Sequence, residues 1–300
     1  MKSFTEVYTN FQNTTKDSSS DTLTLCKMWI NDCVHKVLSL SDWNFNKDSK
    51  TYTSVASQQT YDTPYNAAKI DYVRITSGGV VYTPNEIKSG TLWQNINYVP
   101  VYSDVPQLWN VSNRSRKIGI YPIPSSTAET IKIGYTKKVR DLSVADYTTG
   151  TVTCVADDNT ITGTLTVWNN RMVGRYIKIT SATEVVGDMW LEIVSVAADG
   201  LHLEVRENVP SSVAGAAYVI AEIIPFMEGF EDISLWYALD KFYQMKEMPV
   251  QAREYERFYK DSLDDMLHRD NRSCDDILTK ETPVQIIDPN ANPWGIQIIP

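Results

Sequence analysis

The order of apolar and polar residues predicts helices at the start of this 300-residue chain. Apolar side chains recur every three or four positions in two segments, which is typical of helices with one buried face. The second helix is predicted to be capped at Asp21-Thr22 and to run to about Leu40. The predicted buried faces carry Phe4, Val7, Tyr8 and Phe11 in the first helix and Cys26, Ile30, Cys33 and Val37 in the second.

Short alternating segments follow from about residue 52 to residue 139 and predict strands. Gly78-Gly79 separates residues 70–75 from 80–82, as in a hairpin, and the segments 108–111 and 117–121 make a second pair. Pro122 and Pro124 end the second pair because proline cannot donate to a strand ladder. With a further strand at 130–135, this region predicts a small antiparallel sheet packed with helices, an α+β arrangement.

Residues 148–223 form a separate β module in this interpretation. The close spacing of its strand candidates predicts a β-sandwich or barrel, and glycines between them indicate tight turns with positive φ. The strand candidates are 152–155, 160–162, 176–179, 190–194, 201–205 and 217–220, and the glycines are Gly150, Gly163, Gly174, Gly187, Gly200 and Gly215.

Helical spacing returns after Ile224-Pro225. Two helices are expected, divided at Pro249, and Tyr255, Tyr259 and Leu263 lie on one side of the second. The whole chain then divides into N-terminal helices with a small sheet, an inserted β module, paired helices that complete the first part, and an extended C-terminal tail. Their expected bounds are 1–147, 148–223, 224–269 and 270–300.

The tail combines several prolines with apolar, strand-forming residues. Proline at this density prevents a helix, and so short a segment cannot bury its own apolar side chains. A polar linker is the alternative, but such linkers lack residues of this kind. The tail is therefore predicted to dock on a partner through Ile286, Ile287, Trp294, Ile296, Ile298 and Ile299.

Composition and charge limit the function. The formal net charge of −9 argues against a protein whose main task is to hold DNA, because that task needs clustered Lys and Arg. The largest basic cluster is Lys137, Lys138 and Arg140, which could face a partner protein. No secretory signal and no apolar run long enough to cross a bilayer are visible, which predicts a protein made in a cytoplasm without membrane contact.

No catalytic, cofactor-binding or metal-binding residues are predicted. His35, His202 and His268 are each better explained as surface or capping residues, and the four cysteines lack the spacing of a metal or redox motif. Neither a phosphate-binding glycine loop nor a serine nucleophile motif occurs. Adjacent acids such as Asp264-Asp265 point in different directions, so a cell-wall hydrolase is only a minor alternative.

Several short motifs resemble the head-to-tail adaptor (connector) proteins of tailed bacteriophages. The motifs are the opening Met1-Lys-Ser-Phe-Thr-Glu-Val-Tyr8, Trp29-Ile-Asn-Asp32, Trp43-Asn-Phe45, Gly119-Ile-Tyr-Pro-Ile-Pro-Ser125, Ile131-Lys-Ile-Gly-Tyr135, Thr162-Gly-Thr with Arg171-Met-Val-Gly-Arg-Tyr176, and the helices at 228–268.

This resemblance implies a structural subunit of the virion, assembled in the host cytoplasm, and no enzyme. The subunits would form a homo-oligomeric ring, expected as a dodecamer, that binds the portal protein and a downstream tail protein. DNA would only pass through the channel, and helix residues Tyr255, Phe258 and Tyr259 would line or support it. The alternative from another class is a carbohydrate- or receptor-binding tail module, which would need Trp168 and Trp190 exposed on one face of the β module. A core role for these two residues is favoured.

Overall fold

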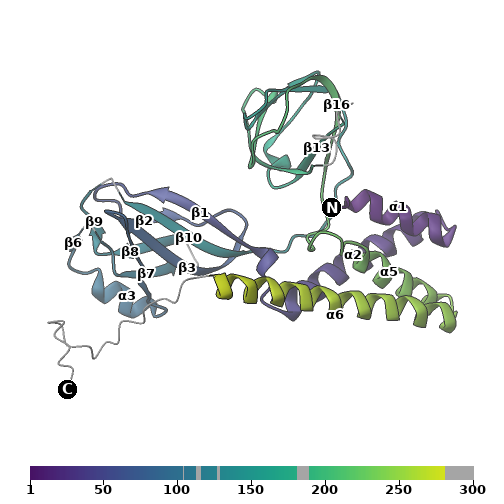
Figure 1. The fold of residues 1–300 in the computed structure, drawn as a ribbon, viewed down its shortest axis with the longest axis horizontal. Coiled ribbons are helices and arrows are strands. Elements are labelled where there is room, and N and C mark those ends of the chain that lie inside the picture. Colours follow the sequence, from purple (N-terminus) through teal and green to yellow (C-terminus); the bar gives the residue numbers. More distant parts are fainter. Residues whose placement is uncertain (104, 113–115, 127–128, 181–188, 281–300) are drawn as a thin grey trace.

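The computed structural model describes residues 1–280 except 104, 113–115, 127–128 and 181–188. The ribbon has three parts: a bundle of helices, a β-sandwich that extends from one end of the bundle, and a β-barrel beside their junction (Figure 1). The α+β class predicted from the sequence is confirmed.

The bundle begins with two capped helices. Ser3 accepts a hydrogen bond from the Glu6 N–H, and the Glu6 carboxylate accepts one from the Ser3 N–H, which satisfies both donors at the first helix end. The second helix is capped by Ser19, ahead of the predicted cap at Asp21-Thr22. The helices of the bundle are α1 (Phe4–Thr15), α2 (Ser20–Leu40), α5 (Asp232–Met245) and α6 (Pro249–Lys280).

The predicted helix faces form the core of the bundle. Phe11 of α1 meets Phe242 of α5 edge to face, with ring centroids 5.5 Å apart. Cys33 of α2 is fully buried and lies in the same apolar cluster as Ile233 and Leu239 of α5. The buried residues Phe4, Val7, Cys26, Ile30 and Val37 confirm the rest of the predicted pattern, and Tyr8 packs against this core partly buried.

Helix α6 is longer than expected. Pro249 is its first residue, a position where the missing N–H costs nothing, and the helix continues to Lys280. The first part of the predicted extended tail, from Asp270, is therefore helical, because no proline or glycine occurs before Pro283. Asp270 is 3% exposed, and its carboxylate accepts from the Asn44 N–H at 3.0 Å. This contact fastens α6 to η1 (Asn44–Asn46).

The strands before residue 140 form two facing sheets, where a single small sheet was expected. One sheet has the order β1-β10-β3-β4 and the other β2-β8-β7-β5. Val73 and Ile75 of β3 lie in one apolar cluster with Ile118 and Ile120 of β8, so each sheet buries one face against the other. The first sheet contains β1 (Lys47–Thr53), β3 (Ala67–Ser77), β4 (Val80–Tyr82) and β10 (Thr130–Lys137), and the second β2 (Thr60–Asp62), β5 (Asn85–Glu86), β7 (Leu108–Ser112) and β8 (Lys117–Tyr121).

Two predicted pairings in the sandwich are confirmed. The strands β3 and β4 form a hairpin around Gly78 and Gly79, both at positive φ, and β7 pairs antiparallel with β8. Helix α3 (Gly90–Ile96) was not predicted, and its Trp93 packs on Gly119, where a Cβ atom would leave no room for the indole. The remaining pair, β6 (Tyr102–Ser103) and β9 (Ile123–Pro124), is parallel.

The β module is a closed barrel with the strand order β11-β12-β15-β14-β13-β16, and all six predicted strands are present. Gly200 has the expected positive φ of 69°, whereas Gly163 lies inside β12, where a side chain would collide with Thr166 and Trp168. The strands are β11 (Thr151–Cys154), β12 (Thr160–Thr164), β13 (Tyr176–Thr180), β14 (Leu191–Val196), β15 (His202–Val205) and β16 (Val213–Ala221), with η2 (Asn170–Met172) between β12 and β13.

Candidate functional site at the junction of the three parts

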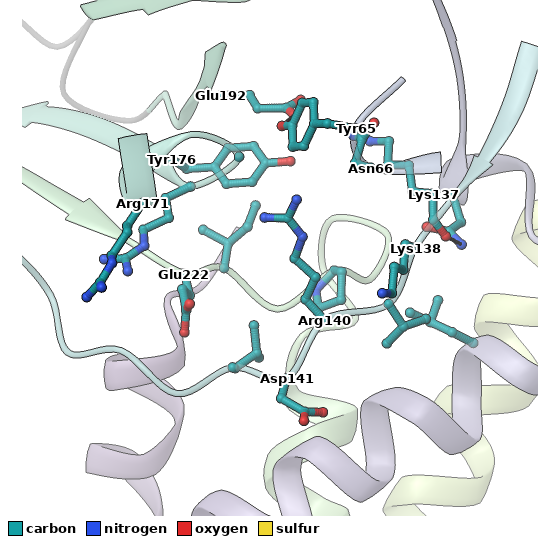
Figure 2. A pocket seen from close by; sticks show the side chains of 18 residues that line it. Tyr65, Asn66, Lys137, Lys138, Arg140, Asp141, Arg171, Tyr176, Glu192 and Glu222 are labelled. Carbon is teal, nitrogen blue, oxygen red and sulfur yellow. Dashed lines mark hydrogen bonds between the residues drawn. The ribbon is translucent and has the colours of Figure 1, made fainter. Parts of the chain in front are cut away.

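The bundle, sandwich and barrel meet around one cavity of about 160 Å³. Its walls come from the segment after β10, the loop before β3, the start of β13 and the segment that leaves the barrel (Figure 2). The polar and aromatic lining includes Tyr65, Asn66, Lys137, Lys138, Arg140, Asp141, Arg171, Arg175, Tyr176, Glu192 and Glu222.

Arg206 joins the barrel to the sandwich beside this cavity. Its Nη1 lies 2.5 Å from Asp48 Oδ2 of β1, and its Nε lies 2.9 Å from Glu192 Oε2 of β14. Burial acts to lower the pKa of Arg206, but the two carboxylates outweigh burial and raise it. The guanidinium therefore stays charged and holds two acids from separate parts of the chain.

Two tyrosines line the cavity next to this ion pair. Tyr65 precedes β3 and Tyr176 begins β13; burial, and secondly the charge of Glu192, raises the pKa of both phenols. The Arg140 guanidinium lies 5.2 Å from the centroid of the Tyr65 ring. In Figure 2 Arg140 extends from the segment after β10 into the cavity, toward both rings. The two phenols are neutral at physiological pH and offer hydroxyl groups and ring faces to a ligand.

The segment between sandwich and barrel is tied to the helices. The Asn31 side chain of α2 accepts from the Leu142 N–H at 2.7 Å and donates to the Leu142 carbonyl at 2.9 Å. The Glu222 carboxylate accepts from the N–H groups of Ser143 and Val144 at 2.6 and 2.9 Å. These bonds satisfy backbone groups on both sides of the junction and hold its shape.

The predicted channel residues lie between α5 and α6. Tyr255 stacks on Tyr243, Phe258 packs on Trp236, and Tyr259 packs on Tyr237, with ring centroids 5.4, 5.9 and 5.3 Å apart. Tyr259 is 7% exposed, and burial raises the pKa of its phenol. All three side chains thus pack within the subunit. The predicted docking residues Ile286, Ile287, Trp294, Ile296, Ile298 and Ile299 lie outside the described residues.

Trp168 is a core residue of the barrel, as predicted from the sequence. It is 3% exposed and its indole N–H donates to the Tyr218 hydroxyl at 3.0 Å. Trp190 is half-buried and lies 5.9 Å from Lys178 Nζ. An aromatic binding face made of both tryptophans is therefore not formed.

Only part of the junction was predicted from the sequence. Lys137, Lys138 and Arg140 were recognised as a basic cluster because they lie close together in the chain. No role was assigned to Arg206, Asp48 or Glu192, because residues so far apart in sequence give no local pattern.

Two kinds of feature are absent from the described residues: a cluster of metal-binding side chains and a membrane-spanning helix. Within the described part of the chain, no group of three His, Cys, Asp or Glu side chains is placed to hold a metal ion. His35 and His202 each lie 2.7 Å from an aspartate, Asp141 and Asp199 respectively, on the surface. A search of the same residues for a helix long and apolar enough to span a bilayer finds none.

Taken together, the fold has three parts that hydrogen bonds and an ion-pair network hold against one another at the junction. The family model described as SU10 adaptor protein matches residues 3–168, more than half of the chain. The chain belongs to this family of phage adaptor proteins, whose role is structural rather than catalytic. The match covers α1, α2, the sandwich and the start of the barrel, whereas the motif at Arg171–Tyr176 and helices α5 and α6 lie beyond it. A search of curated proteins finds no match.

Proposed function

We propose that this protein is the subunit of a ring that lies below the phage portal, continues its DNA channel and docks the next tail component. Membership of the SU10 adaptor protein family is the observation that carries the proposal. The site of such a ring is the virion, after assembly in the host cytoplasm. In a closed ring many weak contacts form together, so no single contact needs high affinity.

Exposed apolar residues at the far end of the sandwich support contacts between subunits or with the portal. Tyr98 is 87% exposed, Val99 61% and Tyr102 56%. They lie in and beside the segment between α3 and β6, at the end of the sandwich remote from the bundle (Figure 1). Large apolar side chains gathered in this way mark a surface that a partner covers.

Helices α5 and α6 would support the channel wall. Tyr255, Phe258 and Tyr259 stiffen the pair from inside. The exposed face of α6 carries charges of both signs, with acidic Glu254, Asp261 and Asp264 beside basic Arg253, Arg257 and Lys260. A wall without an excess of basic side chains would let DNA pass without binding it tightly. The net charge of −9 agrees with this arrangement.

The tail would dock on the portal or on the adjacent adaptor. In this proposal the segments Val284-Gln-Ile-Ile287 and Ile296-Gln-Ile-Ile299 add strands to the partner, and Trp294 fills a pocket. The cost of ordering the tail would be offset by the repeated contacts of the ring.

Native mass spectrometry and electron microscopy of the protein, alone and mixed with its portal protein, test the proposal. A ring is expected with the portal present. A chain ending at Lys280, which keeps α6 intact, should show an unchanged circular dichroism spectrum and fail to join the portal. A Trp294→Ala variant in the full chain tests the pocket without removing the tail.

The outcomes separate the two claims. If neither the full chain nor the truncated chain associates with the portal, the ring proposal is wrong. If both associate equally, the ring survives and the docking role of the tail is rejected. A Tyr98→Ser and Val99→Ser variant then asks whether the exposed end of the sandwich supplies the contact.

A further inference from the structure

The junction cavity carries an excess of positive charge. Lys137 ends β10, and Lys138 and Arg140 follow it. Arg171 lies in η2 of the barrel and Arg175 lies between η2 and β13, so sandwich and barrel each supply part of the basic wall. Within the described residues, none of these five side chains forms an ion pair with a carboxylate, and the Arg140 guanidinium lies over the Tyr65 ring. Figure 2 shows Arg140 and Arg171 on different sides of the cavity.

The acids in the same wall are already engaged. Glu192 pairs with Arg206, Glu222 accepts from two backbone N–H groups, and Asp141 lies 2.7 Å from His35. Their negative charges remain, but five basic side chains against three carboxylates leave the cavity wall positive on balance. A concave basic surface in a chain with a net charge of −9 is a local departure from the overall charge, which favours an anionic ligand.

Asn66 provides a second and independent indication of a ligand in the cavity. Its side chain is 8% exposed and lines the cavity, and its Oδ1 atom has no hydrogen-bond donor among the described residues. Buried amide oxygens normally have a donor. A rotation of the amide toward the cavity would present this oxygen to a ligand N–H. The wall thus offers basic groups for an anion and one acceptor for a donor.

We propose that the junction cavity binds an acidic segment of a partner protein, with an Asp or Glu carboxylate held by Arg140 and Arg171 and a peptide N–H donated to Asn66. An extended peptide carries both groups at short range. A phosphodiester has no donor for Asn66, and a cavity of about 160 Å³ admits one or two side chains and excludes a duplex. This site is independent of ring formation and would fix one partner segment where bundle, sandwich and barrel meet.

Fluorescence anisotropy with the full-length protein and a fluorescein-labelled decapeptide of alternating Glu and Gly tests the site. Removing one charge-assisted hydrogen bond weakens binding by about tenfold, so the Arg140→Ala, Arg171→Ala variant should lose at least that factor. The matched control is Lys132→Ala, Arg253→Ala, which removes two exposed positive charges away from the cavity and should stay within about twofold of wild type. Asn66→Ala should lower the affinity for the peptide and leave the affinity for acetate unchanged.

Each other outcome overturns the proposal. These are absence of peptide binding at millimolar concentration, equal losses in the cavity and control variants, or displacement of the peptide by a 20-base-pair duplex at lower concentration. Thermal melting of every variant verifies the fold. If the double variant melts early, Arg171→Ala alone replaces it, because this exposed side chain has no ion pair among the described residues.

Discussion

Tyr147 and Ile220 pair antiparallel at the base of the barrel, with N–H to O distances of 2.9 and 2.8 Å in the two directions. The chain therefore enters and leaves the barrel at adjacent points. The exit then continues beside the start of the chain, where the Phe4 N–H donates to the Glu222 carbonyl at 2.8 Å. This arrangement is that of a domain inserted into a loop of an otherwise continuous fold.

Replacing residues 148–219 by a short Gly/Ser linker is expected to leave a folded protein. Tyr147 and Ile220 are already in contact, so the linker spans little distance, and the bundle and sandwich keep their own apolar cores. The shortened chain should give one or more cooperative melting transitions and retain its helical circular dichroism signal. Complete loss of cooperative melting would mean that the barrel is required for the other two cores.

Arg206→Ala is expected to loosen the barrel from the sandwich without unfolding either. The variant removes the link between Asp48 and Glu192 and leaves both acids, 14% and 9% exposed, without their cation. Hydrogen exchange measured by mass spectrometry should speed up about tenfold in residues 137–147 and stay unchanged in the barrel strands. Lys69→Ala removes the pairing of an exposed lysine with Asp71 and serves as the control, with no effect expected.

Asp270→Ala is expected to destabilise the bundle by about 1–3 kcal/mol. The substitution removes the buried carboxylate that accepts from the Asn44 N–H, and losing a hydrogen bond to a charged group costs about that much. Urea unfolding followed by tryptophan fluorescence reports on this region, because Trp43 is buried next to Asn44. Asp265→Ala, at an exposed position of the same helix, should change stability by less than about 0.5 kcal/mol. Equal effects of the two substitutions would contradict the assigned role.

Local pattern predicted most of the elements, and contacts between distant segments account for what was missed. The helix faces through Phe11 and Cys33 and the six barrel strands follow from periodicity, which any short window of sequence displays. The second sheet of the sandwich was not predicted. Alternation in the sequence indicates that Ile118 is buried, but it does not show which other strands cover it. The ion pairs of Arg206 were not predicted for the same reason, because its partners Asp48 and Glu192 become neighbours only in the folded chain.

Loss of stability at alkaline pH is expected from the buried thiols of α2. Burial raises the pKa of Cys26 from its usual value near 9 to about 12, and burial raises that of Cys33 as well. The folded state therefore keeps protons that the unfolded chain releases. This contribution is complete below about pH 9 and is lost as the pH rises toward 12.

The comparison of wild type with Cys26→Ala isolates this effect. Wild type should exceed the variant in free energy of unfolding by about 1 kcal/mol at pH 7, and the difference should shrink when urea unfolding is repeated at pH 9.5 and above. Tyrosines that ionise in the same range are common to both proteins and cancel. Val34→Ala leaves a cavity in the same helix without removing an ionisable group, so its difference from wild type should stay constant with pH. If the free energies of unfolding of the two variants change with pH in the same way, the alkaline loss of stability does not come from Cys26.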